Sequence, residues 1–116
     1  MAGGLTAAVI DTLCGQPAAG MLIDLFRLQH GKGQRQHLRT VESAAAGSTL
    51  IEGDPLVPAT YELLFHVGRY FKGQRVVLDQ AAFIDVIPVR FTVTHPAHAH
   101  HLTLLASPWS YTVYRI

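Results

Sequence analysis

The sequence predicts an all-β fold, and three observations lead to this prediction. Apolar and polar residues alternate over residues 60–67 and again over 86–93, which is the period-two pattern of half-buried strands. Turns that contain glycine or proline separate these segments from other short apolar ones. The chain has 116 residues, 49% of them hydrophobic, which suffices for a single domain over residues 1–116 with its own core. Several short strands joined by turns favour a β-sandwich.

The first strands are expected at Thr6–Asp11 and Met21–Gln29, with Gly15-Gln16-Pro17 as the turn of a hairpin between them. A second hairpin would join Met21–Gln29 to a strand at His37–Ser43 through the glycine-containing segment 31–33. Both hairpins follow from the order of apolar runs and turn residues along the chain.

The middle of the chain adds two strands and a helix. The apolar face of segment 60–67 ends at Val67, where the alternation stops, and Tyr70 and Phe71 follow at a spacing that suits a helix. We therefore expect one helix of about two turns at Gly68–Gln74. Pro88 has no N–H to donate, so the strand over 86–93 should lie at a sheet edge or begin there.

Composition excludes several classes of protein. The net charge is +1 and the basic residues are scattered, so no nucleic acid partner is expected. The apolar run over residues 80–89 contains Asp85 and falls short of the roughly 18 residues of a membrane span, and no signal peptide is recognisable. Cys14 is the only cysteine, which suggests a reduced, cytoplasmic protein. No cofactor is expected.

Two C-terminal strands carry the candidate site. His101, Thr103 and Leu105 share one face of a strand, and Thr112 and Tyr114 share one face of the next. Together they form a patch of imidazole, hydroxyl and phenol groups with apolar neighbours, as in a small-molecule site. From the residues alone, an ordinary solvated face is the alternative.

The same region is rich in histidine, which raises the question of a metal site. His95, His98, His100 and His101 would supply neutral nitrogen ligands. Adjacent residues of a strand point to opposite faces, however, so His100 and His101 could not both reach one ion. We expect a solvated, histidine-rich turn and no metal.

Five further residues are interpreted structurally. Asp11 and Asp24 interrupt apolar strands, and turn bonding or an ion pair is expected for each. His37 and His66 are interpreted as exposed strand residues, and Trp109 as an aromatic that packs over the core from a turn.

Four stretches resemble the transthyretin-like family, whose enzymatic branch is 5-hydroxyisourate hydrolase. They are LTAAVIDTLCGQPAAGMLIDLFRL (5–28), TYELLFHVGRYF (60–71), IDVIPVRF (84–91) and HAHHLTLLASPWSYTVYRI (98–116). The resemblance covers nearly the whole chain. It implies eight strands in two four-stranded sheets with one short helix, and a homotetramer that binds a small molecule in a channel between its subunits.

The resemblance also implies roles for individual residues. Counted back from Ser107-Pro108-Trp109, His101 falls on the position of the hydrolases' His-x-His motif that contributes a catalytic imidazole. Tyr114 and Arg115 match the first half of the terminal Tyr-Arg-Gly-Ser, and complete the expected catalytic set. The ligand channel would be lined by Ala8, Ile10, Ser48, Thr103, Leu105 and Thr112.

Two positions depart from the hydrolase pattern. Where the hydrolases read Thr-His-Val-Leu-Asp, this chain reads Ala-Ala-Val-Ile-Asp over 7–11, so Ala8 replaces a catalytic histidine. Where they read Asn-x-Asp-Gly-Arg, the segment 43–48 ends at Ser48, so the active-site arginine is missing. A general acid or base contributes roughly 10² to 10⁴ in rate and an oxyanion-stabilising donor about 10² to 10³. Hydrolysis of 5-hydroxyisourate should be weak or absent.

Three functions remain open. The first is a hydrolase of the 5-hydroxyisourate type in purine metabolism, with His101 as acid and base. The second is a repurposed relative that catalyses another acid–base reaction, such as cyclisation or isomerisation of a small metabolite. The third is a non-catalytic binder, as transthyretin is for an aromatic hormone. The family resemblance favours the first, and Ala8 and Ser48 favour the others because they make the channel wider and less polar.

Overall fold

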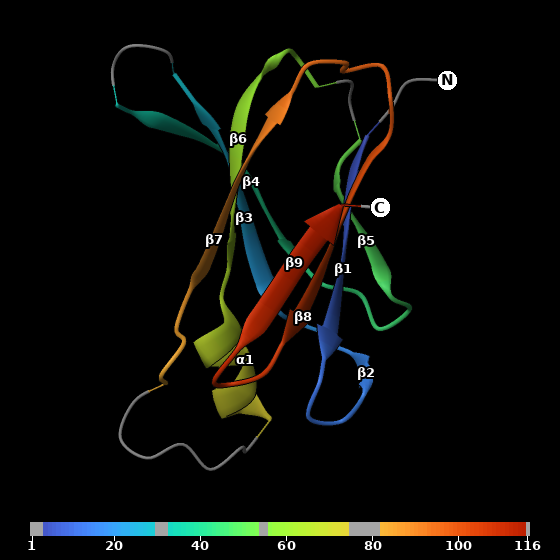
Figure 1. Cartoon of the computed structure of the whole chain (residues 1–116), viewed down its shortest axis with the longest axis vertical. Coiled ribbons are helices and arrows are strands. Elements are labelled where there is room, and N and C mark those ends of the chain that lie inside the picture. Colours follow the sequence, from blue (N-terminus) through green and yellow to red (C-terminus); the bar gives the residue numbers. More distant parts are fainter. Residues whose placement is uncertain (1–3, 30–32, 54–55, 75–81, 116) are drawn as a thin grey trace.

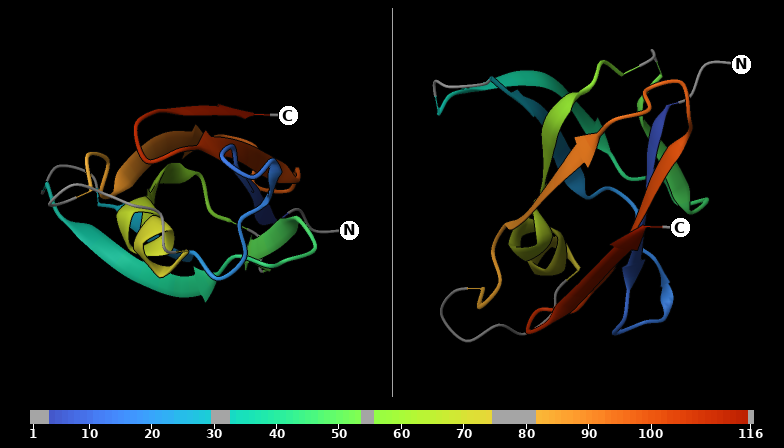
Figure 2. Two further views of the ribbon diagram at one scale, coloured as in Figure 1. Left: turned by 90° about the horizontal axis from the view of Figure 1, so that it is seen from below. Right: turned by 45° about the horizontal axis from the view of Figure 1, so that its top comes forward.

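Two β-sheets pack face to face in the computed structural model, which describes residues 4–29, 33–53, 56–74 and 82–115. Figure 1 shows the strands and the helix, and the left view of Figure 2 looks along the sandwich from the end that carries the helix. The predicted all-β sandwich with one short helix is therefore confirmed. Its elements are β1 (Leu5–Asp11), β2 (Gln16–Pro17), β3 (Leu22–Leu28), β4 (Arg35–Glu42), β5 (Ser48–Glu52), β6 (Ala59–Phe65), α1 (Val67–Gly73), β7 (Ile87–Val93), β8 (His100–Ala106) and β9 (Tyr111–Arg115).

The two sheets differ in size. Sheet B contains four strands in the order β4-β3-β6-β7. Sheet A contains five, in the order β2-β1-β8-β9, with β5 pairing along the same edge of β1 as β2. The expected four-stranded sheet thus gains a strand because the two residues of β2 fold back on the end of β1. No helix in the described part of the chain is long and apolar enough to cross a membrane.

The core lies between the facing sides of the two sheets. Tyr61, Leu63 and Phe65 of β6 are buried on one side, as their alternation predicts. The side of sheet A that faces them is lined by apolar residues of β1 and β8, among them Val9 and Leu104. Alternate residues of β1 and β8 therefore point away from the core, onto the outer face of sheet A.

One of the two predicted hairpins is present. β3 and β4 pair antiparallel from Leu22↔Glu42 to Leu28↔Arg35, with residues 31 and 32 of the turn outside the described residues. The hairpin between β1 and β3 is wrong, because these strands lie in different sheets. After β2, Gly20 adopts a positive φ of 82° and the chain crosses to sheet B. The long partner of β1 is instead β8, in parallel over all of Leu5–Asp11.

Two local predictions about β7 and α1 are confirmed. Pro88 lies in β7, an edge strand of sheet B that pairs with β6 only. The helix α1 buries Tyr70 and Phe71 and begins one residue earlier than expected. Trp109 does not cover the core, however: its side chain is 57% exposed, because the 107–110 turn is closed by its own serine hydrogen bonds.

The polar residues of the apolar strands have the partners expected of them. Asp11 accepts hydrogen bonds from the backbone N–H of Leu13 and from the hydroxyl of Tyr70, each at 2.9 Å. Asp24 pairs with His66 and His37, whose Nε2 atoms lie 2.7 and 3.3 Å from its carboxylate. His37 is exposed as predicted. His66 is not an exposed strand residue, since it follows β6 and is half-buried against Asp24.

Candidate active site on the outer face of sheet A

A row of four candidate residues crosses the outer face of sheet A. Ser48 of β5 is the register partner of Ala8 in β1, Ala8 is the partner of Thr103 in β8, and Thr103 is the partner of Tyr114 in β9. Residues opposite one another on neighbouring strands point to the same side of a sheet. The four side chains therefore lie abreast, although they come from four separate segments of the sequence.

Two further rows flank this one. On one side, Thr6 pairs with His101. On the other, Ile10 pairs with Leu105, and Leu105 pairs with Thr112. The structure thus brings all the candidate site residues except Arg115 onto one face.

His101 has a partner that the sequence did not reveal. The Oγ1 atom of Thr6 lies 2.7 Å from Nδ1 of the imidazole, so one ring nitrogen is held and Nε2 is left for another partner. If Nδ1–H donates to the hydroxyl, Nε2 carries a lone pair and can act as a base. Thr6 lies two residues before Ala8 in β1, so both side chains point to the same face of the sheet. Only the parallel pairing of β1 with β8 places Thr6 beside His101.

The hydroxyl of Thr103 is the unusual group of this face. Its Oγ1 atom is buried and has no hydrogen-bond partner within the described residues. Leaving such a group unpaired costs about 1–3 kcal/mol. Because the atom is buried, a ligand on this face would reach it only after the side chains that cover it have moved.

The loop before β5 sets the position of Ser48. The buried hydroxyl of Ser43 accepts a hydrogen bond from the N–H of Met21 at 2.9 Å, and the hydroxyl of Thr49 accepts one from the N–H of Ala44 at 2.7 Å. Gly47 completes the loop with a φ of 113°. Because Ser48 and Ala8 are register partners, the two departures from the hydrolase pattern lie next to each other. Where the hydrolases have a histidine and an arginine, the outer face of sheet A thus carries the methyl group of Ala8 beside the small hydroxymethyl side chain of Ser48.

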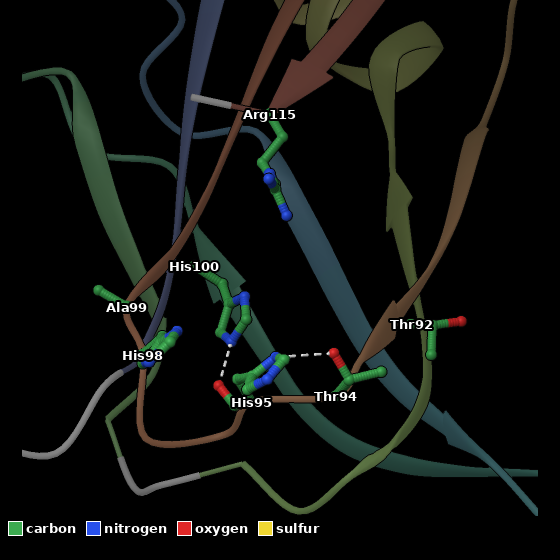
Figure 3. A pocket seen from close by; sticks show the side chains of 7 residues that line it. All are labelled: Thr92, Thr94, His95, His98, Ala99, His100 and Arg115. Atoms are coloured by element: carbon green, nitrogen blue, oxygen red, sulfur yellow. Dashed lines mark hydrogen bonds between the residues drawn. The ribbon is translucent and has the colours of Figure 1, made fainter.

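Arg115 does not lie with the other candidates. It is the register partner of Leu102, whose side chain belongs to the core, and so it points to the opposite side of sheet A from Tyr114. Figure 3 shows its side chain extending toward His100 and His95. Adjacent residues of a strand cannot share one face, and the expected set of His101, Tyr114 and Arg115 is divided for that reason.

The arrangement limits the chemistry that this face can perform. His101 supplies one imidazole that can exchange a proton, and Tyr114, 45% exposed, supplies a phenol. No group of three or more potential ligands that could hold a metal is found among the residues that the structure describes. His101 and Tyr114 give this face groups for proton transfer and hydrogen bonding.

Comparison with known proteins gives the family. Residues 5–115 match the family model described as HIUase/Transthyretin family. The chain is 42% identical over 117 residues to 5-hydroxyisourate hydrolase 2 of Rhizobium meliloti, covering 97% of this chain and 95% of the relative. It is 38% identical over 113 residues to the 5-hydroxyisourate hydrolase of Mus musculus, covering 96% and 92%.

Solved structures agree with this result. A crystal structure of (S)-allantoin synthase superimposes with a TM-score of 0.86 and 32% identity, covering 98% of this chain but only 43% of that longer one. Sea bream transthyretin in complex with thyroxine superimposes with a TM-score of 0.83 and 25% identity, covering 97% and 94%. The chain belongs to the HIUase/Transthyretin family. Within that family, its curated relatives are named 5-hydroxyisourate hydrolases.

Proposed function

We propose that this chain is a 5-hydroxyisourate hydrolase-like protein of purine metabolism that acts on a small heterocyclic metabolite at the outer face of sheet A. The observation that carries the proposal is the convergence of Thr6, His101, Thr103 and Tyr114 on one face through strand pairing. The names of the relatives support the substrate class.

The outer face of sheet A would become an enclosed binding site only if another subunit packed against it. Leu50 and Tyr114 are 56% and 45% exposed on this face. Leu50 lies in the row of Thr6 and His101, and Tyr114 lies one row from the apolar side chains of Ile10 and Leu105. Such an apolar face favours contact with a second subunit, which would close it into a channel. We propose a homotetramer with the ligand between subunits, in the cytoplasm.

His101 would act as the acid and base. Hydrolytic opening of a ring requires water to be activated for attack on a carbonyl carbon, and Nε2 of His101 would accept the proton from that water. Thr6 would hold the ring through Nδ1, the exposed hydroxyl of Tyr114 would position the substrate, and Thr103 would line the site beneath it. With Ala8 and Ser48 in the adjoining row, no second imidazole and no guanidinium assist, so we expect hydrolysis to be slow.

A second candidate is a repurposed acid–base reaction such as cyclisation or isomerisation. The adjacency of Ala8 and Ser48 favours it, because together they remove the proton donor and the charge that hydrolysis uses. The likeness to (S)-allantoin synthase supports this candidate as well.

Stopped-flow measurements with freshly prepared 5-hydroxyisourate test the proposal. His101→Ala should lower the catalysed rate by roughly 10² or more if the imidazole is the base. A matched control is His37→Ala, which removes an exposed histidine from sheet B and should leave the rate unchanged. A His101→Ala protein as active as its parent would move the chemistry elsewhere.

A further inference from the structure

A second site lies at the end of the sandwich opposite α1. It is a pocket of about 240 Å³ formed by the end of β7, the loop over residues 94–99, the start of β8 and the end of β9. Figure 3 shows its lining, in which the polar side chains are those of Thr92, Thr94, His95, His98, His100 and Arg115. The pocket does not overlap the outer face of sheet A, because His100 and His101 point to opposite sides of β8.

Among the described residues that line the pocket, the only permanently charged side chain is that of Arg115. Arg115 carries a permanent positive charge and forms no ion pair with another residue in the described part of the chain. None of the residues that line the pocket is aspartate or glutamate. An arginine without a carboxylate partner, beside three imidazoles, provides donors but no negative charge.

The imidazoles are held in place by local contacts. The rings of His95 and His98 stack with their centroids 5.2 Å apart and their planes 9° from parallel. The Nε2 atom of His100 lies 3.0 Å from the carbonyl oxygen of His95 and donates to it, so Nδ1 remains for a ligand or a proton. The hydroxyl of Thr94 lies 3.0 Å from Nδ1 of His95. These contacts fix the imidazole rings before any ligand arrives.

We propose that this pocket binds a small, multiply charged oxyanion, either a phosphate group or a pair of carboxylates. The guanidinium of Arg115 matches such groups with parallel N–H donors, and the imidazoles and the Thr94 hydroxyl supply further hydrogen bonds. The site is separate from the one proposed for the heterocyclic metabolite, so this ligand would be an effector or a second metabolite.

Binding at this pocket is coupled to protons. The charged and titratable groups facing it are Arg115, His95, His98 and His100. Two stacked imidazoles that were both protonated would repel each other and the arginine, and a bound anion offsets that repulsion. The pocket should therefore hold an anion more tightly when its imidazoles carry a proton, so affinity should be greater under acidic than under alkaline conditions.

Calorimetric titration of the full chain with inorganic phosphate and, separately, with citrate tests the proposal. Saturable binding of at least one anion is expected at about pH 5.5, with clearly weaker binding at about pH 8. Phosphate alone would identify a phosphate site, and citrate alone a carboxylate site. Imidazole resonances of His95, His98 and His100 should shift on titration, and those of His37 and His66 on sheet B should not.

Variants locate the site. Arg115→Gln should weaken binding about tenfold or more, because it removes a charge-assisted hydrogen bond of about 1.5–3 kcal/mol. Arg69→Gln is the matched control: Arg69 is an exposed arginine of α1, at the other end of the molecule, and its loss should leave affinity unchanged. Circular dichroism checks that each variant is folded. Absence of saturable binding by both anions at the lower pH, or equal weakening by the two variants, would overturn the proposal.

Discussion

Asp24 is the most heavily hydrogen-bonded carboxylate on the outer face of sheet B. It accepts hydrogen bonds from Nε2 of His66 at 2.7 Å, from the hydroxyl of Thr40, and from Nε2 of His37 at 3.3 Å. Burial raises its pKa, but the hydrogen bonds from Thr40, His66 and His37 outweigh burial, and the pKa of Asp24 is lowered from its ordinary value of 3.8. The charged form is thus the one that the fold stabilises.

The lowered pKa of Asp24 predicts how its contribution to stability changes with pH. Because the folded pKa lies below the unfolded one, the stabilising contribution of Asp24 is present above about pH 4 and is lost as the pH falls through the folded pKa. Asp24→Asn should lower the free energy of unfolding by about 1–3 kcal/mol near neutral pH, and by less at about pH 3. Urea unfolding at both pH values measures the difference. Glu42→Gln, at an exposed carboxylate of β4, is the control. An equal loss for Asp24→Asn at both values would contradict this assignment.

A buried hydrogen bond between Tyr70 and Asp11 links the helix α1 to sheet A. The Tyr70 hydroxyl donates to Oδ2 of Asp11 at 2.9 Å, and the two residues are 8% and 5% exposed. Burial, together with the bond to the Asp11 carboxylate, raises the pKa of Tyr70 above its ordinary value. The hydroxyl therefore stays protonated and keeps the helix docked against the end of β1.

Tyr70→Phe should destabilise the fold by about 1–3 kcal/mol, because it leaves a buried carboxylate oxygen without its donor. Tyr111→Phe is a matched control, since Tyr111 is 46% exposed and a surface change of this kind stays within about 0.5 kcal/mol. Thermal or urea unfolding of the two variants gives the comparison. Equal stability of Tyr70→Phe and the parent chain would show that the contact contributes nothing.

The sequence predicts where the strands lie better than it predicts which strands pair with each other. The alternation through Tyr61, Leu63 and Phe65 follows from burial of one side of a strand, and it identifies β6 directly. Pairing between β1 and β8 joins residues about a whole chain length apart, and no local pattern encodes it. The hairpin expected between β1 and β3 was wrong for that reason. β5 was missed because its polarity does not follow its burial: Thr49 points inward and Leu50 outward, so the sequence shows no alternation of apolar and polar residues there.

For the whole molecule, we predict a homotetramer. The reason is the outer face of sheet A, where Leu50 and Tyr114 are exposed and where Ile10 and Leu105 add apolar surface. Burial of this apolar surface between subunits would favour the assembly, because it removes apolar side chains from water. Light scattering at micromolar concentration should give four times the chain mass of 12.7 kDa. A monomer would contradict the tetramer and the channel with it.

The candidate site could be predicted from the sequence largely through the family resemblance. The alternation of side chains along β8 and β9 predicts that His101 and Thr103 share a face, and that Tyr114 lies on one face of the next strand. Only the register between strands shows that Ala8 and Ser48 lie beside them. Arg115 was grouped with Tyr114 because the two are adjacent in the family's sequence motif. Adjacent residues of a strand point to opposite faces, so only Tyr114 lies on the face of the candidate site. Thr6 went unnoticed because nothing local connects a threonine of β1 with a histidine of β8.

With Ala8 and Ser48 in place of the family's histidine and arginine, the His101 site is expected to keep the family's geometry but not its full catalytic power. Stopped-flow decay of freshly made 5-hydroxyisourate, with the parent chain and with Ala8→His combined with Ser48→Arg, tests this most directly. The parent should be slow, and the double variant should gain roughly 10² or more in rate, since it restores an acid–base group and a charge. Turnover by the parent chain near 10 s⁻¹ or above, a typical enzyme rate, would contradict the claim.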